Sequence, residues 1–295
     1  MKLANVSVSQ LEYLDAALAH ATWKDAAAAV GVSASAFSQG IAELERRLGV
    51  TLFDRQGRQR TARPEARVAA EHATRILSEH RSLARWAEET REGGVGQLTI
   101  GMIDTAAVHH FGDALMAFRS LHPDVALRLL VQPSASLLER LHAGEVDAVV
   151  CVQPDPSPKL QIVPLLTEAL HVYAPPGVVA GPPATWGPWV SFPSDSRTRA
   201  LVGRALRPRG IAFTVVAESS QPAVLREMVQ LGMGWTVLAA VDAEREPHAL
   251  RRVVDAPVAE RVLALCRRSD RQPAAALERL IEVLLPSGPP DKVGG

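Results

Sequence analysis

Residues 22–49 contain the pattern that most constrains how this chain folds. Thr22 is a candidate N-cap for a short alanine-rich helix, Trp23 to Val30, and Gly31 tolerates the left-handed backbone that a tight turn needs. Ser33 can cap a second helix that ends at Gly49 and has apolar residues at intervals of three and four, namely Phe37, Ile41, Leu44 and Leu48. Two helices joined by a short turn containing glycine form a helix-turn-helix unit.

The outward face of the second helix carries short, uncharged side chains. By helical spacing it presents Ser35, Ser38, Gln39 and Ala42. Glutamine suits the N6 and N7 edge of adenine, hydroxyls suit donors or acceptors, and an alanine methyl suits the thymine methyl. A face meant only for solvent would usually carry lysine and glutamate, so the pattern predicts that this helix enters a DNA groove.

Seven arginines lie between residues 46 and 67, with only Asp54 and Glu65 to oppose them. The whole chain has 32 basic and 32 acidic residues, but phosphate contacts depend on charge within about 8–10 Å. Two extended pieces around Gln56-Gly57 predict a hairpin, or wing, whose arginines grip the DNA backbone; a solvated basic loop is the alternative. The candidate DNA-binding residues are Thr22, Ser33, Ser35, Ser38, Gln39, Ala42, Arg46, Arg55, Arg58, Arg60 and Arg63.

Two further helices are expected, one on each side of this unit. Ser9 is a candidate cap for a first helix with one apolar stripe, Leu11, Leu14, Leu18 and Ala21. Pro64 opens a glycine-free run to Glu92 whose stripe contains Ala69, Ala73, Ile76, His80, Leu83 and Ala87. Small residues at this spacing predict packing against another helix, either a second copy of itself or its own domain. Gly93 to Gly96 then supplies a flexible joint.

From Gln97 onward, short apolar strands alternate with amphipathic helices. The strands are LTIGMI, VALRLLV and DAVVCV, followed by PWVSF, IAFTVVA and WTVLAA; the helices are expected near 107–121, 134–143, 196–206 and 220–231. This alternation indicates parallel pairing in an α/β sheet built as two halves. Ligands of such sheets bind at the carboxyl ends of the strands, beside helix N-termini.

Several functional classes are disfavoured. No apolar run approaches the roughly 18–20 residues that span a bilayer, and Glu12 and Asp15 interrupt any signal sequence, so we expect a cytoplasmic protein without membrane contact. Cys151 and Cys266 lie in apolar runs, which favours buried structural thiols. The motifs of phosphate-binding, dinucleotide-binding, serine-hydrolase and zinc-protease sites are absent, so we expect no enzyme activity, cofactor or metal.

The run from Leu44 to Arg55 reads L-E-R-R-L-G-V-T-L-F-D-R and resembles the L-E-x-x-L-G-x-x-L-F-x-R motif of the LysR-type transcriptional regulators. Downstream, HPDVALRLLV, LLERLHAGEVDAVV and VLREMVQLGMGWTVL are similar to motifs of that family's effector domain, so the resemblance covers nearly the whole chain. There are two departures. Ser38-Gln39-Gly40 stands where members often have S-R-Q, and the segment 62–66, ARPEA, stands where L-T-x-A-G is usual.

The resemblance implies an α+β multidomain fold. It places an all-α winged helix-turn-helix domain over 1–63, a linker and dimerisation helix over 64–92, a hinge over 93–97, an α/β effector-binding domain over 98–287 and a tail over 288–295. The effector-binding domain would have two Rossmann-like halves of the type 2 periplasmic-binding-protein kind, half I over about 98–169 and 267–287 and half II over about 170–266. The implied partners are double-stranded DNA, a small-molecule effector and further copies of the chain, as a dimer or tetramer joined through the linker helix, with RNA polymerase as a candidate.

The resemblance also implies an effector site between the halves. Its candidate residues are Asp104, Thr105, Ser134, Ser136, Ser194, Ser196, Arg197, Thr198, Ser219, Trp235 and Thr236. Serines at helix starts can act as caps or as ligand contacts. With Arg197 they favour an organic acid, whereas Asp104 favours an amine, and an amino acid would satisfy both.

The expected function is therefore a DNA-binding regulator whose operator binding or promoter activation responds to a small molecule. One alternative is a redox-sensing regulator that uses Cys151 and Cys266. Arg267 and Arg268 follow Cys266 and keep this alternative open, because reactive thiols lie in electropositive surroundings. A less favoured alternative is an enzyme or solute-binding protein of the same α/β fold.

Overall fold

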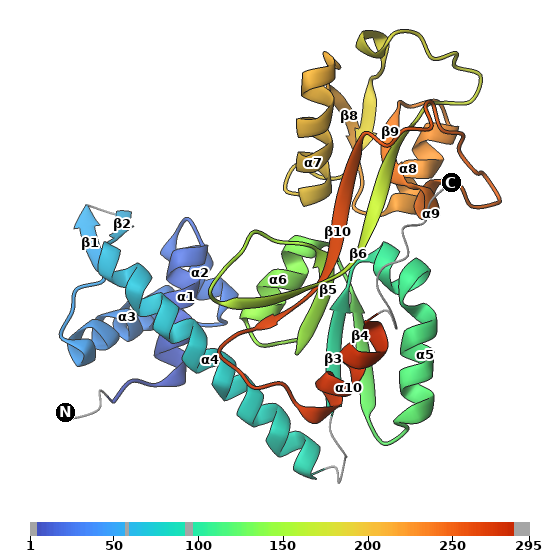
Figure 1. Ribbon diagram of the computed structural model, residues 1–295. Coiled ribbons are helices and arrows are strands. Elements are labelled where there is room, and N and C mark those ends of the chain that lie inside the picture. Colours follow the sequence, from blue (N-terminus) through green and yellow to red (C-terminus); the bar gives the residue numbers. More distant parts are fainter. Residues whose placement is uncertain (1–4, 57–58, 92–96, 286–295) are drawn as a thin grey trace. The chain divides into compact units, whose positions relative to one another are not determined.

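The computed structural model describes residues 5–56, 59–91 and 97–285 (Figure 1). The chain divides into two compact units, residues 1–91 with 142–145 and residues 92–141 with 146–295. Three of the expected features lie outside the described residues: the hinge except Gln97, the tail over 288–295, and Arg58. The side chain of Arg55 is also outside them.

The first unit is a three-helix core followed by a hairpin and a long helix (Figure 1). Its elements are α1 (Val8–Ala19), α2 (Trp23–Ala29), α3 (Ala34–Leu48), β1 (Phe53–Gln56), β2 (Gln59–Ala62) and α4 (Pro64–Arg91). Leu14 from α1 packs with Phe37, Ile41 and Leu44 from α3, and all four are fully buried. Most of the predicted apolar positions therefore face the core, but Leu48, at the end of α3, is exposed over 36% of its surface, and Ala21 lies beyond the end of α1 and is exposed.

The helix boundaries follow their caps, with one correction. Thr22 accepts a hydrogen bond from the Asp25 amide (3.2 Å), and Ser33 accepts one from the Ala36 amide (3.2 Å), so both predicted caps are confirmed. The cap of α1 is Ser7, so the prediction of Ser9 was wrong. Ser7 and Gln10 form a reciprocal capping box, in which each side chain accepts from the other's backbone amide (3.0 and 3.3 Å). Ser9 is also followed three residues later by an acidic residue, Glu12, but it lies inside α1 and does not cap it.

The stripe predicted for the long helix divides into two parts. Ala73 is fully buried, and Ala66 and Leu77 are buried beside it where α4 packs against α1. Ile76 and Leu83 are exposed over 51% and 60% of their surface. One side of α4 therefore belongs to the core of its own unit, while Ile76 and Leu83 form an adjacent apolar strip that is largely exposed among the described residues.

The second unit is an α/β domain (Figure 1). Its strands are β3 (Gln97–Met102), β4 (Ala126–Val131), β5 (Ala148–Val152), β6 (Leu160–Tyr173), β7 (Trp189–Ser191), β8 (Val215–Glu218), β9 (Thr236–Ala239) and β10 (Ala259–Arg268). Its α-helices are α5 (Gly112–Leu121), α6 (Ser134–His142), α7 (Arg197–Leu206), α8 (Pro222–Gln230), α9 (Ala240–Ala243) and α10 (Ala275–Leu284). Three short helical turns are η1 (Ala106–His110), η2 (Pro183–Thr185) and η3 (Arg207–Arg209).

The main sheet has the strand order β4-β3-β5-β10-β6-β9. β3 pairs in parallel with β4 and β5, as expected, whereas β10 runs antiparallel to both β5 and β6, and β6 runs antiparallel to β9. β5 and β6 therefore run in the same direction on either side of β10, and the short segment that joins them contains no helix. In the second half β7 and β8 pair in parallel.

Two local expectations for this unit were wrong. The helix expected near 107–121 is interrupted, because a π-helical turn over Ala106–His110 precedes α5 and Phe111 separates them. The strand expected over IAFTVVA is formed only by Val215–Glu218. The π-helical turn matters for the site, because it carries the two adjacent histidines.

Candidate functional sites

The face of α3 expected to meet DNA is turned outward. Ser35, Gln39 and Ala42 are exposed and Ser38 is half-buried, while the apolar positions between them are buried. Ser33 and Thr22 are exposed as well, although both hydroxyls also cap helices. The helix thus presents the predicted uncharged groups on one face.

The end of α3 carries a cluster of three charges. Glu43 accepts hydrogen bonds from Arg46 (2.5 Å to Nη2) and from Arg47 (2.6 Å to Nε). The hydrogen bonds from Arg46 and Arg47 lower the pKa of Glu43 to about 2. Arg46 still exposes 71% of its side chain, so it can reach a phosphate. Because the Glu43 carboxylate offsets one of the two arginine charges, the three side chains together carry one net positive charge.

Glu45 ties α3 to the wing. Its carboxylate accepts hydrogen bonds from the backbone amides of Leu52 (2.7 Å) and Phe53 (3.0 Å), at the entrance to β1. Glu45 is the glutamate of the L-E-x-x-L-G motif, and this contact gives it a structural role: it holds the start of the wing against α3. Arg63, at the end of the wing, lies 3.6 Å from Asp54.

Gly40 is required by the packing of α1 on α3. A Cβ atom at this position would lie 2.4 Å from Cδ2 and 2.5 Å from Cε2 of Tyr13, closer than real atoms approach. The Tyr13 ring also packs on Phe37, with ring centres 5.3 Å apart. The glycine in Ser38-Gln39-Gly40, where family members often have a larger residue, leaves the space that the Tyr13 ring of α1 occupies.

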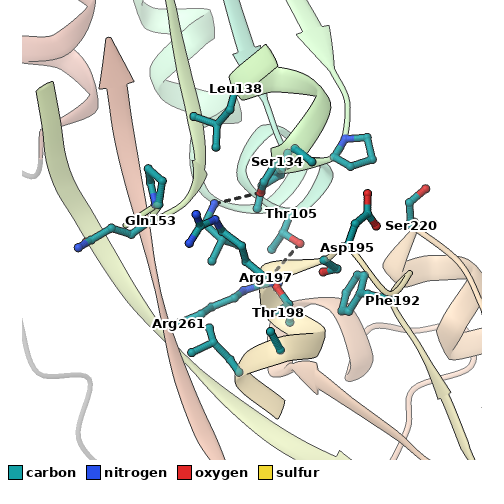
Figure 2. Close-up of a pocket in the computed structure, with 18 of the residues that line it drawn as sticks. Thr105, Ser134, Leu138, Gln153, Phe192, Asp195, Arg197, Thr198, Ser220 and Arg261 are labelled. Atoms are coloured by element: carbon teal, nitrogen blue, oxygen red, sulfur yellow. Dashed lines mark hydrogen bonds between the residues drawn. The ribbon is translucent and has the colours of Figure 1, made fainter. Parts of the chain in front are cut away.

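The second unit contains a cavity of about 1080 Å³ between its two halves (Figure 2). Ser134 and Leu138 line it from α6, Arg197 and Thr198 line it from α7, and Arg261 lines it from β10. Seven of the candidate effector-binding residues line this cavity, namely Asp104, Thr105, Ser134, Ser136, Ser196, Arg197 and Thr198. The lining also includes Asp195 and Ser220, which lie in segments that the family resemblance implies, and residues that the sequence had not indicated, among them Gln153, Arg204 and Arg261.

Four candidates, Ser194, Ser219, Trp235 and Thr236, are not among the lining residues. Trp235 stacks on Trp186 in the core of the second half, with ring centres 5.6 Å apart. Thr236 is fully buried within β9, and the Ser219 hydroxyl accepts a hydrogen bond from the Gln221 amide (3.1 Å). Ser194 is exposed outside the lining.

The cavity carries both signs of charge. Arg197 pairs with Asp155 at 3.2 Å, but Asp155 exposes 90% of its side chain, so solvent screens the pair. Among the described residues, neither Arg204 nor Asp104 has a hydrogen-bond or ion-pair partner. A cation and a carboxylate are thus available to a ligand.

A buried charge network lies beneath the cavity. Arg261 on β10 is paired in register with Glu168 on β6, and its Nε atom donates to the Glu168 carboxylate at 2.6 Å. The same guanidinium donates to Thr198 (3.2 Å) and Thr105 (3.3 Å), and its Nη2 atom is 3.5 Å from the Asp242 carboxylate. The network therefore connects both halves through the two shared strands.

The adjacent histidines belong to this network. His110 hydrogen-bonds Glu168 at 2.7 Å, and His109 lies 3.6 Å from Asp242. Burial lowers the pKa of His109, and the Arg245 charge acts in the same direction. Among the described residues no grouping of three or more His, Cys, Asp or Glu side chains could hold a metal ion.

The pKa values of the two buried carboxylates, Asp242 and Glu168, are shifted in opposite directions. Burial raises the pKa of Asp242 to about 6, because the Arg261 charge and the hydrogen bond from Thr105 only partly compensate for lost hydration. Burial also opposes ionisation of Glu168, but hydrogen bonds from His110 and Arg261 outweigh it and lower the pKa of Glu168. Glu168 is therefore the ionised partner of Arg261.

The two cysteines are buried in neighbouring strands. Cys151 lies on β5 and Cys266 on β10, and neither is exposed to solvent. A hydrogen bond with Cys266 and burial both raise the pKa of the Cys151 thiol. Because the thiolate is the reactive form, this setting opposes oxidation of Cys151.

Comparisons with known proteins agree with these two units. The family described as "Bacterial regulatory helix-turn-helix protein, lysR family" matches residues 8–67, and the "LysR substrate binding domain" matches residues 91–288. The chain is 27% identical to YfeR, an HTH-type transcriptional regulator of Shigella flexneri, over 96% of this chain and 95% of that one. It is 29% identical to a probable hydrogen peroxide-inducible genes activator of Streptomyces viridosporus, over 94% and 93%.

Solved structures show the same fold. CbnR in complex with its target DNA superposes with a TM-score of 0.60 at 21% identity, covering 95% of this chain and 99% of that one. OxyR of Pseudomonas aeruginosa superposes with a TM-score of 0.54 at 22% identity, covering 95% and 93%. Within the described residues, no helix has both the length and the apolar character to cross a membrane.

Proposed function

The chain belongs to the LysR family of transcriptional regulators, and from this premise we propose how its two units divide the work. The first unit binds promoter DNA through α3 and the wing, and the second binds a small effector in its cavity. The observation that carries the proposal is the outward, uncharged face of α3 beside a wing rich in arginine.

In this proposal α3 recognises the base sequence of the DNA, and the arginines contact the DNA phosphate backbone. Ser35, Gln39 and Ala42 are the exposed groups that can meet base edges. Arg46 and Arg63 carry charge to the phosphates. Arg55 and Arg58 are carried over from the sequence prediction with the same role.

A gel-shift experiment with the DNA upstream of the chain's own gene tests this division. We expect salt-sensitive, sequence-selective binding by the full-length protein. Gln39→Ala should relax the sequence preference, whereas Arg63→Ala should weaken binding to all sequences alike. The opposite pattern would show that the two roles are exchanged, and binding without any selectivity would reject the proposal.

The effector is proposed to be an amino acid or another small organic acid. Arg197 and Arg204 offer positive charge on α7, and the hydroxyls of Ser136 and Ser196 can donate hydrogen bonds to a carboxylate. Asp104 offers a site for an amine. A ligand that binds one arrangement of the two halves more tightly shifts the balance between arrangements.

A thermal-shift screen of full-length protein with carboxylic acids, amines and amino acids tests the ligand class. If an amino acid is the effector, its stabilisation should be lost in Arg204→Ala and in Asp104→Asn. A plain organic acid should lose stabilisation only in Arg204→Ala. Stabilisation by amines alone would contradict the proposal.

The remaining expectations follow from the same assignment. We infer a cytoplasmic protein, because promoter DNA lies there, and a dimer or tetramer that pairs through α4. RNA polymerase is a candidate partner at the promoter. We further infer that the cavity binds its ligand without converting it, and turnover of a bound effector would contradict this.

A further inference from the structure

Trp23, the first residue of α2, touches the three elements that form the DNA-binding surface. Its ring packs edge-on against Phe37 of α3, with ring centres 5.7 Å apart, and against Phe53 of β1 at 5.5 Å. The guanidinium carbon of Arg60, on β2, lies over the same ring at 4.8 Å from its centre. One half-buried aromatic side chain thus contacts both the DNA-facing helix and the two strands of the wing.

Arg60 is held by this ring and by no other described group. Among the described residues it makes no hydrogen bond and no ion pair, although Glu45 and Asp54 line the same small cavity. The two carboxylates are engaged elsewhere, since Glu45 accepts two backbone amides and Asp54 lies 3.6 Å from Arg63. The guanidinium of Arg60 therefore keeps its hydrogen-bond donors available.

This cavity, of about 260 Å³, lies between α3 and the wing. The hydroxyls of Ser38 and Thr51 line it together with Arg60 and Trp23. It therefore brings a fixed cation and two hydroxyl groups to the space between the helix that would enter a groove and the wing that would follow the backbone. Arg60, Ser38 and Thr51 are the lining residues that can donate to a phosphate of the DNA strand. The carboxylates of Glu45 and Asp54 line the cavity too, but Glu45 is held by two backbone amides and Asp54 lies beside Arg63.

We propose that Trp23 is a positioning residue for DNA binding, which acts by holding the Arg60 guanidinium over its ring at the junction of α3 and the wing. The proposal rests on the DNA-binding function proposed above. A guanidinium attracted to the face of an aromatic ring keeps N–H groups available to donate to a phosphate or a guanine. Because the ring restricts the arginine before DNA arrives, less side-chain entropy is lost on binding.

The test is a double-mutant cycle on full-length protein, with duplexes that this protein selects from a random pool. The affinity and its salt dependence are measured for wild type, Trp23→Leu, Arg60→Ala and the double variant. Arg60→Ala should weaken binding to all selected duplexes and lower the salt slope by about 1. Trp23→Leu should weaken binding about two- to fivefold, the range of an exposed cation–π contact.

The decisive comparison is Trp23→Leu in the Arg60→Ala background, where we expect no further loss. Arg67 is exposed on α4 outside this cavity and supplies the matched control. In an Arg67→Ala background, Trp23→Leu should keep its full two- to fivefold effect. Trp23→Phe retains an aromatic face and the core packing, so its affinity should remain closer to that of wild type.

Three outcomes would overturn the proposal. If Trp23→Leu weakens binding equally in the presence and absence of Arg60, Trp23 acts only through core packing. If Arg60→Ala leaves affinity and salt slope unchanged, Arg60 is no DNA contact. If the wild-type protein selects no duplex, the DNA-binding function itself fails. Melting temperatures are measured alongside, and should Trp23→Leu unfold the unit, the same cycle with Trp23→Phe decides the question, because equal losses in both backgrounds would again reject it.

Discussion

Asp242 is a buried side chain whose pKa is shifted toward neutral pH. The Thr105 hydroxyl donates one bifurcated hydrogen bond to the two oxygens of its carboxylate (2.9 and 3.0 Å), and the carboxylate lies at the edge of the Arg261 network. Because burial raises its pKa from 3.8 to about 6, the folded state holds the proton more tightly than the unfolded state does. The stability from this group is present below pH 4 and is lost as the pH rises through about 6.

Asp242→Asn should remove this pH dependence. An asparagine oxygen can still accept from Thr105 but does not titrate, so the variant should gain stability relative to wild type between about pH 4 and pH 7. The gain corresponds to at most about 3 kcal/mol. Thermal unfolding of both proteins across this range measures it. His109 and Glu168 have lowered pKa values and give wild type an opposing trend, so the difference between the two proteins is the quantity to follow. A difference that stays constant with pH would contradict the assignment.

The two cysteines yield a prediction about reactivity. Since both are buried and the pKa of Cys151 is raised, neither should react with a thiol reagent such as Ellman's reagent until the protein unfolds. Hydrogen peroxide should leave DNA binding unchanged, both in wild type and in Cys151→Ser with Cys266→Ser. Peroxide-dependent DNA binding that disappears in the serine variants would instead support a redox-sensing regulator, the alternative raised by the similarity to a peroxide-inducible activator.

At the scale of elements, the contact between α1 and α3 depends on the absence of a side chain at Gly40. Alanine normally stabilises a helix interior by about 1 kcal/mol relative to glycine. Here Gly40→Ala should destabilise the DNA-binding unit, because the new Cβ meets the Tyr13 ring. In a Tyr13→Ala background the ring is gone and Gly40→Ala should become neutral or stabilising. Thermal unfolding of the four proteins shows the reversal; equal effects in both backgrounds would contradict the packing argument.

Local signals decided which elements could be predicted from the sequence. The caps Thr22 and Ser33 and the stop at Gly49 depend on groups within one or two turns, and all three are confirmed. Ser7 and Ser9 are two positions apart, and each is followed three residues later by a residue of the capping-box type, Gln10 and Glu12, so the local pattern does not distinguish them. The interruption of the helix before α5 had no comparable signal.

Contacts between distant segments could not be predicted in the same way. Glu168 and Arg261 are 93 residues apart and meet only because β6 and β10 pair in that register. A signal was nevertheless present, since each is a charged residue inside an apolar strand, where charges are rarely buried without a partner. The sequence contains no signal that Arg204 lines the cavity or that Trp235 does not. Both depend on how side chains pack in the folded domain, where Trp235 stacks on Trp186.

At the scale of the whole molecule, the exposed strip on α4 predicts self-association. Ile76 and Leu83 are seven residues apart and exposed, the spacing of one helix face in a coiled coil. Ile76→Glu with Leu83→Glu should convert the assembly to a monomer, as measured by light scattering after gel filtration. Arg67→Glu, on the other side of the helix, is the matched control and should leave the mass unchanged. A monomeric wild type would contradict the inferred assembly.

The position of β10 within the main sheet has a consequence for how the chain is made. β10 is among the last strands along the chain, yet it lies between β5 and β6, which precede it by about a hundred residues. During synthesis on the ribosome, β5 and β6 cannot pair with β10 until residues 259–268 have emerged. The helix-turn-helix and wing, by contrast, are complete by residue 62. A chain cut short before β10 would therefore carry the helix-turn-helix and wing attached to two separate sheets, β4-β3-β5 and β6-β9, in which β5 and β6 are additional unpaired edges. Unpaired strand edges favour aggregation.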